Sequence, residues 1–326
     1  MSAVKTAFIT GVTGQDGSYL AELLINKGYL VHGLTKTLSV NLKGLDLEFK
    51  GISSKLVLHS GDVSEKSTIY ELIKKIKPDE VYHLATKHDL SDSLDNYLAI
   101  RSVDFDGTYF LLNAIKELKS SCKFFFASTS KVFGRVTSSP QNENTLFNPN
   151  SLYGISKVAS MFLVEMFRNS YDMFACSGIL YNHESPRRDQ FFLPKKITNA
   201  AAKIKMGLEK ELKLGDIEAK RDWGFAKDYV EAMWLMLQAN RPEDYIIGTG
   251  EVHSVKDILE IAFGSLDLEW QKYVIIDEKY IRPKEDFETV ADISKIKSDL
   301  NWEPKTKFEE MIILMVKSDL ASFSNK

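Results

Sequence analysis

A tyrosine and a lysine four residues apart have the spacing of a proton-transfer pair. Tyr153 and Lys157 fall in an expected helix, and this spacing puts both side chains on one helical face. A nearby ammonium, together with the positive charge of an oxidised nicotinamide, favours the phenolate and lowers the pKa of a tyrosine. Tyr153 could then take a proton from an alcohol that Thr129, at the end of an expected strand, hydrogen-bonds. We predict Thr129, Tyr153 and Lys157 as catalytic residues.

A glycine-rich turn near the start of the chain has the spacing of a dinucleotide site. It follows a short apolar run and precedes leucines at helical spacing. Its glycines let the backbone approach a pyrophosphate, and the following helix presents amides and a positive dipole end to the phosphates. Either motif alone is common, whereas the two in this order form a strong pattern. The residues predicted to hold the cofactor are Gly11, Gly14, Gln15, Asp16, Gly17, Tyr153 and Lys157.

The ends of the second and third expected strands bear on the kind of dinucleotide. Residues 32–37 contain no acid to accept the ribose hydroxyls of NAD. Lys36 could instead face a 2'-phosphate, which favours NADP, although a solvated surface lysine accounts for it equally well. Asp62 stands where the adenine would lie, although a simple helix cap also accounts for it. We predict NADP or NAD as cofactor, with Lys36 and Asp62 beside its adenosine part.

The segments that must position these residues alternate between strand and helix. This alternation is typical of an α/β fold with a doubly wound parallel sheet of Rossmann type, whose ligands bind at the carboxyl ends of the strands. Apolar runs predict strands, and apolar residues at helical spacing predict helices. The predicted strands are residues 4–10, 29–34, 56–59, 80–85, 124–128 and 174–181, and the helices besides the one after the glycine turn are residues 64–76, 100–118 and 152–171.

After residue 181 the pattern changes to a basic stretch followed by further helices, which indicates a smaller helix-rich substrate domain. We predict a dinucleotide-binding Rossmann domain of residues 1–181, to which residues 225–249 also belong. Residues 182–224 and 250–326 would form the nucleotide-sugar-binding part. The helices predicted beyond residue 181 are residues 197–206, 228–238, 255–262 and 308–318.

The composition excludes several classes of partner. A chain of 326 residues with 44% hydrophobic residues and a net charge of −3 has a full core and no uniform field for nucleic acid or an anionic membrane. Cys122 and Cys176 lie in apolar stretches, which suits thiols in a reducing compartment. The chain start has no apolar signal core, and no later segment has the length of a membrane span. We expect a cytoplasmic protein with no nucleic-acid partner, no membrane partner and no metal site.

Four motifs carry a resemblance to known enzymes. Residues 10–20, 182–188, 221–224 and 301–304 resemble the extended short-chain dehydrogenase/reductase superfamily and, within it, most closely the GDP-mannose 4,6-dehydratase family. The resemblance implies a GDP-linked sugar as substrate and a homodimer or homotetramer that uses helix faces within residues 105–118 and 151–167. A near-neutral protein must meet the GDP dianion with a few placed cations, for which arginine offers a bidentate fork. The residues implied for holding GDP are Asn182, Lys196, Arg221, Arg282 and Glu285.

Residues near the expected chemistry depart from this family. Elimination of water from C5 and C6 needs an acid or base besides the tyrosine, and the family has a glutamate two residues after the threonine. Here that position is Lys131. A buried lysine with a lowered pKa could act as the C5 base, as the resemblance to C5-inverting sugar dehydratases implies. Otherwise Lys131 is structural and elimination is lost. The remaining departures are Lys87, His88 and Asp89 in place of Gln-Ser-His, Phe225 in place of a histidine, and Lys36-Thr37 in place of two arginines.

Three hypotheses follow from these residues. The first is a GDP-hexose 4,6-dehydratase with Lys131 as a catalytic base and Lys87 as a substrate contact. The second is a C4 oxidoreductase, either a 4-keto reductase or a 4-dehydrogenase, on a GDP-linked hexose or heptose, for which Thr129, Tyr153 and Lys157 suffice. The third is a non-catalytic dinucleotide-binding sensor, against which the intact triad argues.

Overall fold

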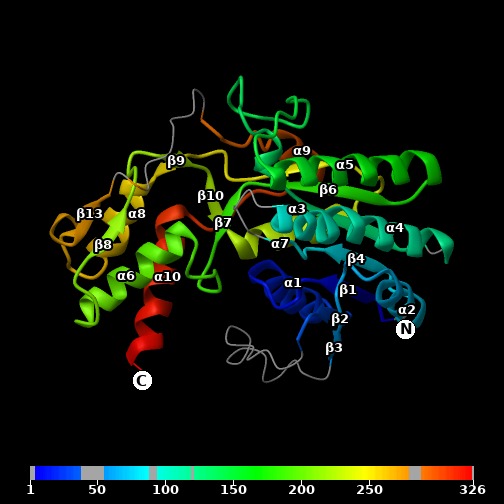
Figure 1. The fold of residues 1–326 in the computed structure, drawn as a ribbon, viewed down its shortest axis with the longest axis horizontal. Helices are drawn as coiled ribbons and strands as arrows, with labels where there is room; N and C mark the ends of the chain where they lie inside the picture. The colour runs from blue at the N-terminus through cyan, green and yellow to red at the C-terminus, as the bar shows by residue number, and fades with distance from the viewer. Residues whose placement is uncertain are drawn as a thin grey trace.

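A seven-stranded parallel sheet forms the centre of the larger lobe (Figure 1). The computed structural model describes residues 4–37, 55–87, 94–118, 121–277, 279 and 288–324. The strand order is β11-β6-β5-β4-β1-β2-β3, the order of a doubly wound Rossmann sheet. The strands are β1 (Thr6–Thr10), β2 (Leu30–Thr35), β3 (Leu56–Ser60), β4 (Glu80–His83), β5 (Lys123–Thr129), β6 (Ala175–Leu180) and β11 (Tyr245–Ile247).

Helices cover both faces of this sheet, so its central strands are apolar on both sides. In β5, Phe125 faces the core under α1 (Gln15–Asn26) and α7 (Ala226–Gln238). Phe124 and Phe126 point the other way, because side chains alternate along a strand. They pack in the core formed with α2 (Lys66–Ile76), α4 (Gly107–Glu117) and α5 (Leu152–Tyr171).

The helix predicted at residues 100–118 is interrupted. The chain forms α3 (Leu94–Arg101), then a π-helical turn over Ser102–Asp106, and then α4. A π-helical turn holds one more residue than an α-helical turn, so it changes which side chains face inward. Asp104, inside this turn, is fully buried.

The smaller lobe has its own hydrophobic core. It contains α6 (Leu193–Lys205), α8 (Val255–Gly264) and α10 (Phe308–Ser324), with β8 (Leu212–Leu214) beside β13 (Val274–Ile276). The Lys195 ammonium lies 2.6 Å from the Asp319 carboxylate, which ties α6 to α10. In contrast, Trp302, which follows α9 (Ser294–Leu300), packs in the core of the larger lobe.

Short strands join the two lobes. β7 (Asn182–Glu184) pairs in parallel with β10 (Trp223–Phe225), and both lie between the lobes (Figure 1). β9 (Lys220–Arg221) pairs antiparallel with β12 (His253–Ser254). Within the part of the chain that the structure describes, no helix combines the length and the apolar character needed to cross a bilayer.

Candidate active site

The glycine turn after β1 forms a backbone cradle. Gly11 has a φ of +73°, and a Cβ there would lie 2.8 Å from the backbone nitrogen of Ala85. A Cβ on Gly17 would collide with the carbonyl oxygen of Gly11. Gly14 begins α1, and no described side chain caps this helix end, so its first amides are available to an anion. Only glycine fits at Gly11 and Gly17, and the cradle suits a pyrophosphate.

The side chains of Gln15 and Asp16 turn toward the segment after β6. Gln15 Nε2 donates to the carbonyl oxygen of His183 at 3.1 Å, and Ser185 Oγ donates to Gln15 Oε1 at 2.8 Å. Asp16 Oδ2 lies 2.9 Å from His183 Nε2. Burial lowers the pKa of His183, but the Asp16 carboxylate outweighs burial and raises it above the usual value. The two residues predicted for the cofactor thus also connect the glycine turn to the smaller lobe.

Lys36 and Asp62 lie together at the ends of β2 and β3. The Lys36 ammonium is 2.7 Å from the Asp62 carboxylate, and Asp62 also accepts a hydrogen bond from the amide of Ser64 at 3.0 Å. Burial raises the pKa of Asp62, but these partners outweigh it and hold the pKa below the usual value. A dinucleotide in the cradle would therefore meet a paired lysine at this edge rather than an isolated one.

The structure brings Thr129, Tyr153 and Lys157 together. Ser151 caps α5 by accepting a hydrogen bond from the Gly154 amide at 3.1 Å, so Tyr153 and Lys157 lie in the first turns of the helix. Both side chains are buried. Lys157 Nζ lies 5.6 Å from the centre of the Tyr153 ring and donates to the carbonyl oxygen of Ala127 at 2.9 Å. Thr129 is the last residue of β5.

Two features of the structure bear on the proton of Tyr153. In the chain by itself the pKa of Tyr153 is raised, by burial first and by the Asp104 carboxylate second, while the hydroxyls of Thr86 and Thr129 act in the opposite direction. The lowered pKa predicted from the sequence requires Lys157 together with the positive charge of an oxidised nicotinamide. Asp104 lies 3.3 Å from Lys157 Nζ and offsets the positive charge of this lysine.

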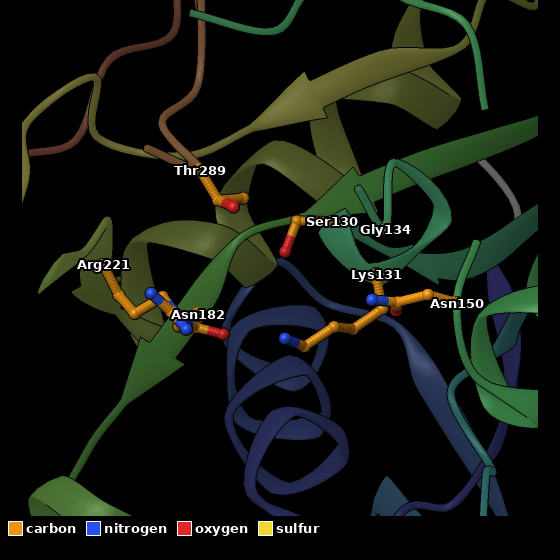
Figure 2. Close-up of a pocket in the computed structure, with 7 residues that line it drawn as sticks. All are labelled: Ser130, Lys131, Gly134, Asn150, Asn182, Arg221 and Thr289. Carbon is orange, nitrogen blue, oxygen red and sulfur yellow. The ribbon is translucent and has the colours of Figure 1, made fainter. Parts of the chain in front are cut away.

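A polar pocket opens at the carboxyl end of β5 (Figure 2). Figure 2 shows the Lys131 amine pointing into this pocket, toward the side where Asn182 and Arg221 lie. Lys131 is exposed, in a short 3-10 turn over Ser130–Val132, so the expectation that this lysine is buried was wrong. The 3-10 turn directs the Lys131 side chain away from the core, so this side chain faces the pocket. The lining residues are Ser130, Lys131, Gly134, Asn150, Asn182, Arg221 and Thr289.

The residues implied for GDP divide into three groups. Asn182 and Arg221 line the pocket together. Lys196 is exposed on α6, and its amine donates to the carbonyl oxygen of Lys213 at 2.9 Å, away from the pocket lining. Arg282 and Glu285 lie outside the described residues.

The residues that differ from the pattern of the family lie in different parts of the structure. Lys87 is exposed just beyond β4, whereas His88 and Asp89 lie outside the described residues. Phe225 is buried, and its ring meets Tyr19 edge-on with the ring centres 6.1 Å apart. No group of three or more His, Cys, Asp or Glu in the described ranges is placed to hold a metal ion.

Sequence reasoning missed residues that surround the triad. Asp104 contacts Lys157, and Thr86 acts on the pKa of Tyr153. A signal for Asp104 was present, since an acid flanked by Val103 and Phe105 in an expected core helix must find a partner. No comparable signal marks Thr86, a single hydroxyl after a strand.

The chain is similar to known proteins along most of its length. It matches the family model described as GDP-mannose 4,6 dehydratase over residues 8–315. It is 43% identical to GDP-mannose 4,6 dehydratase 1 of Arabidopsis thaliana over 325 residues, covering 97% of this chain and 90% of that protein.

Two solved structures share the fold at low identity. One is RMD from Pseudomonas aeruginosa complexed with NADPH, with a TM-score of 0.83, 20% identity and coverage of 98% of this chain and 100% of that chain. The other is dTDP-glucose 4,6-dehydratase from Bacillus anthracis in complex with NAD, with a TM-score of 0.83, 20% identity and coverage of 97% and 96%. The chain described here belongs to the GDP-mannose 4,6-dehydratase family and has the Rossmann-type fold of NAD(P)-dependent sugar-nucleotide enzymes.

Proposed function

We propose that this protein transfers a hydride at C4 of a GDP-linked hexose, with GDP-mannose as its first candidate substrate, and then eliminates water from C5 and C6. The observation that carries the proposal is the buried pair Tyr153 and Lys157 beside Thr129. Ser130 and Lys131, which follow Thr129 in the chain, line a pocket together with Asn182 and Arg221. Membership of the family supports the choice of sugar nucleotide.

Tyr153 would act as the base at C4. Its phenolic oxygen takes the proton of the C4 hydroxyl, which Thr129 holds by a hydrogen bond. Gly11, Gly14 and Gly17 would hold the pyrophosphate of a nicotinamide dinucleotide, which would supply the hydride acceptor for C4 and, in its reduced form, the hydride donor for C6. Lys157 stabilises the phenolate, with its own ammonium held by the carbonyl oxygen of Ala127.

Cations in and near the pocket would hold the diphosphate. Arg221 offers a bidentate fork and Asn182 a neutral donor, and both already line the pocket. Lys196, Arg282 and Glu285 complete the set that the family resemblance implies. We place this set in the nucleotide-sugar-binding part, residues 182–224 and 250–326, opposite the Rossmann part of residues 1–181 and 225–249.

Lys131 would supply the proton chemistry of elimination. Once C4 is a ketone, the C5 hydrogen is acidic; a neutral Lys131 amine takes this proton and passes it to the departing C6 hydroxyl, so that water leaves. The proton later added at C5 balances the one that Tyr153 took at C4. A lysine acts as a base only in its neutral form, so we expect elimination to accelerate as the pH rises. Lys87 would contact the sugar from the end of β4.

One observation favours a second candidate function, a C4 oxidoreductase. The exposure of Lys131 leaves it without the desolvation that would make it a good base at neutral pH. Simple oxidation or reduction at C4 needs only Thr129, Tyr153 and Lys157.

Mass spectrometry of GDP-mannose incubated with enzyme and NADP or NAD separates these functions. Loss of water indicates dehydration, and loss of two hydrogens indicates oxidation alone. For a dehydratase with a lysine base, Lys131→Met stops water loss but keeps C4 oxidation, while Lys297→Met, a surface control on α9, changes neither. Water loss that survives in Lys131→Met would remove Lys131 from the mechanism. A gain of water loss in Lys131→Glu would show that a carboxylate serves at this position.

NADP is our proposed cofactor over NAD. A 2'-phosphate at the end of β2 would compete with Asp62 for the Lys36 ammonium, to which it offers a stronger charge. We expect Lys36→Met to weaken NADP binding while leaving NAD binding unchanged, as measured by fluorescence titration with the reduced cofactors. An equal loss for both cofactors would contradict this assignment.

An apolar surface on α4 and α5 supports a homodimer, or a homotetramer built from such dimers. Ile155, Phe162 and Met166 are exposed on one face of α5, and Tyr109 is exposed on α4. The two helices pack side by side (Figure 1). Patches of this kind are typical of interfaces. We expect Phe162→Glu to convert the assembly to monomers in light scattering; an unchanged mass would rule out this face.

We propose a cytoplasmic location. Cys122 and Cys176 are both free and buried, which suits a reducing compartment. Fractionation of the source cells would test this.

A further inference from the structure

A buried ion pair lies behind the catalytic triad. Lys157 Nζ is 3.3 Å from Asp104 Oδ1, and the two side chains are 2% and 0% exposed. Burying two charges is costly, and the interior of a protein tolerates it only when the charges are paired. Since Lys157 already belongs to the proposed proton-transfer machinery, the cost of burying Asp104 needs a reason at this site.

The π-helical turn is what places Asp104 there. Residues Ser102–Asp106 interrupt an otherwise continuous helical segment between α3 and α4. The backbone carbonyl of Asp104 accepts a hydrogen bond from Ser160 Oγ of α5 at 3.0 Å, which fixes the turn against the helix that carries Tyr153 and Lys157. Such turns often occur at functional sites, because they direct one side chain inward without ending the helix.

The charged groups around this pair come from several elements. His83 of β4 is buried and neutral, because burial lowers its pKa to about 3 and Lys157 acts in the same direction. Arg188, beyond β7, lies close enough to lower the pKa of Tyr153. Burial lowers the pKa of Lys157, and Asp104 acts against burial. Burial also raises the pKa of Asp104, and Lys157 acts against burial. When both groups are ionised, their opposite charges, 3.3 Å apart, offset each other beside Tyr153.

We propose that Asp104 is a positioning residue that holds the Lys157 ammonium and offsets its charge, so that Tyr153 keeps its proton until the positive charge of an oxidised nicotinamide arrives. Proton removal at C4 then becomes dependent on the oxidation state of the bound cofactor. This inference rests on the hydride-transfer function proposed above. It adds the requirement that oxidised cofactor is bound before Tyr153 loses its proton, which Tyr153, Lys157 and Thr129 alone do not impose.

Removing the Asp104 carboxylate should shift the pKa of nearby groups in one known direction. A negative charge raises the pKa of every nearby group, so its loss lowers the pKa of both Tyr153 and Lys157. The whole pH profile of turnover should therefore move to lower pH. A residue that only supports the fold would lower the rate and leave the profile in place.

The test compares Asp104→Asn with Asp106→Asn. Asp106 belongs to the same π-helical turn, but its side chain is 32% exposed and pairs with Arg101 at 3.4 Å on the surface. For Asp104→Asn we expect the pH profile of kcat to move by at least about one unit to lower pH, a shift that the contact distance makes easily large enough. The Asp106→Asn profile should match that of the wild type.

A binding measurement tests the same idea without turnover. Asp104→Asn leaves Lys157 uncompensated, so oxidised cofactor, with its positive nicotinamide, should bind roughly fivefold more weakly relative to reduced cofactor at pH 6. Calorimetry with both forms gives this ratio. If wild-type protein turns over no GDP-sugar, the proposed function fails, whereas the binding ratio still decides the role of Asp104.

Two further variants guard against a folding defect. Asp104→Ser leaves room for a water beside Lys157 and should give the same shift and the same change in the binding ratio. Asp104→Glu keeps the charge, and its pH profile should stay at the wild-type position even if the rate falls. An unmoved profile together with an unchanged binding ratio in both Asp104→Asn and Asp104→Ser would overturn the proposal.

Discussion

His183 and Asp16 form a charged contact that joins the glycine turn to the smaller lobe. His183 Nε2 lies 2.9 Å from Asp16 Oδ2, with the two side chains 11% and 20% exposed. Its Nδ1 lies 2.7 Å from the carbonyl oxygen of Tyr181, which can only accept. Because both ring nitrogens face acceptors, we expect a protonated imidazolium. Asp16→Asn removes its counter-charge.

The pH range in which this pair acts follows from the two pKa shifts. The pKa of His183 is raised above 6.5, so its contribution is complete below 6.5 and is lost as the pH rises through the folded value. The pKa of Asp16 is lowered from 3.8, so its contribution is complete above 3.8 and is lost as the pH falls through the folded value. The pair therefore stabilises the protein most between pH 3.8 and pH 6.5.

The magnitude follows from the burial of the pair. Breaking a fully buried ion pair costs about 3–5 kcal/mol, and the partial exposure of this pair reduces the cost to about 2 kcal/mol at pH 5.5. For a chain of this size that free energy lowers Tm by roughly 3 °C. Towards pH 8.5 the difference between the two proteins should narrow, because the contribution of His183 is lost as the pH rises through its folded-state pKa.

Scanning calorimetry of the wild type and Asp16→Asn at both pH values measures this difference. Glu303→Gln is the matched control, since it breaks the exposed pair of Lys297 and Glu303 and should leave Tm unchanged. Equal melting of Asp16→Asn and the wild type at pH 5.5 would refute the reasoning, and so would a difference that is as wide at pH 8.5.

Three other variants test the site. Tyr153→Phe should lower kcat by about 100-fold or more at unchanged Tm, because it removes one hydroxyl that acts in the transition state; near-full activity would exclude Tyr153 as the base. Arg221→Ala should weaken GDP binding by about 2 kcal/mol in calorimetry while cofactor affinity stays the same, and an unaltered GDP affinity would contradict the anchor role. Gly17→Ala should abolish cofactor binding in fluorescence titrations, since its Cβ would collide with the Gly11 carbonyl; normal binding would show that the turn can adjust.

Local patterns were enough to predict the sheet. The strands expected near residues 4–10, 124–128 and 174–181 are β1, β5 and β6, because a strand buried on both faces must be a short apolar run. The helix at residues 152–171 is α5 with the same bounds. The helix expected at residues 100–118 was only partly right, since no local signal announces a π-helical turn.

The exposure of Lys131 and the pKa of Tyr153 depend on how residues that are distant in the sequence pack together. Lys131 was expected to be buried, but a 3-10 turn directs it into the pocket. In the chain by itself, burial and the Asp104 carboxylate raise the pKa of Tyr153, and Asp104 also offsets the charge of Lys157.

The sequence by itself determined the alternation of strands and helices, the glycine turn and the helical face shared by Tyr153 and Lys157, because each depends on residues close together in the chain. Only the tertiary structure decided how Asp104 meets Lys157 and how Asp16 meets His183. Asp104 and Lys157 are 53 positions apart in the chain, and Asp16 and His183 are 167 positions apart. The energies of these contacts depend on burial and on distance in space, and the order of residues along the chain contains neither.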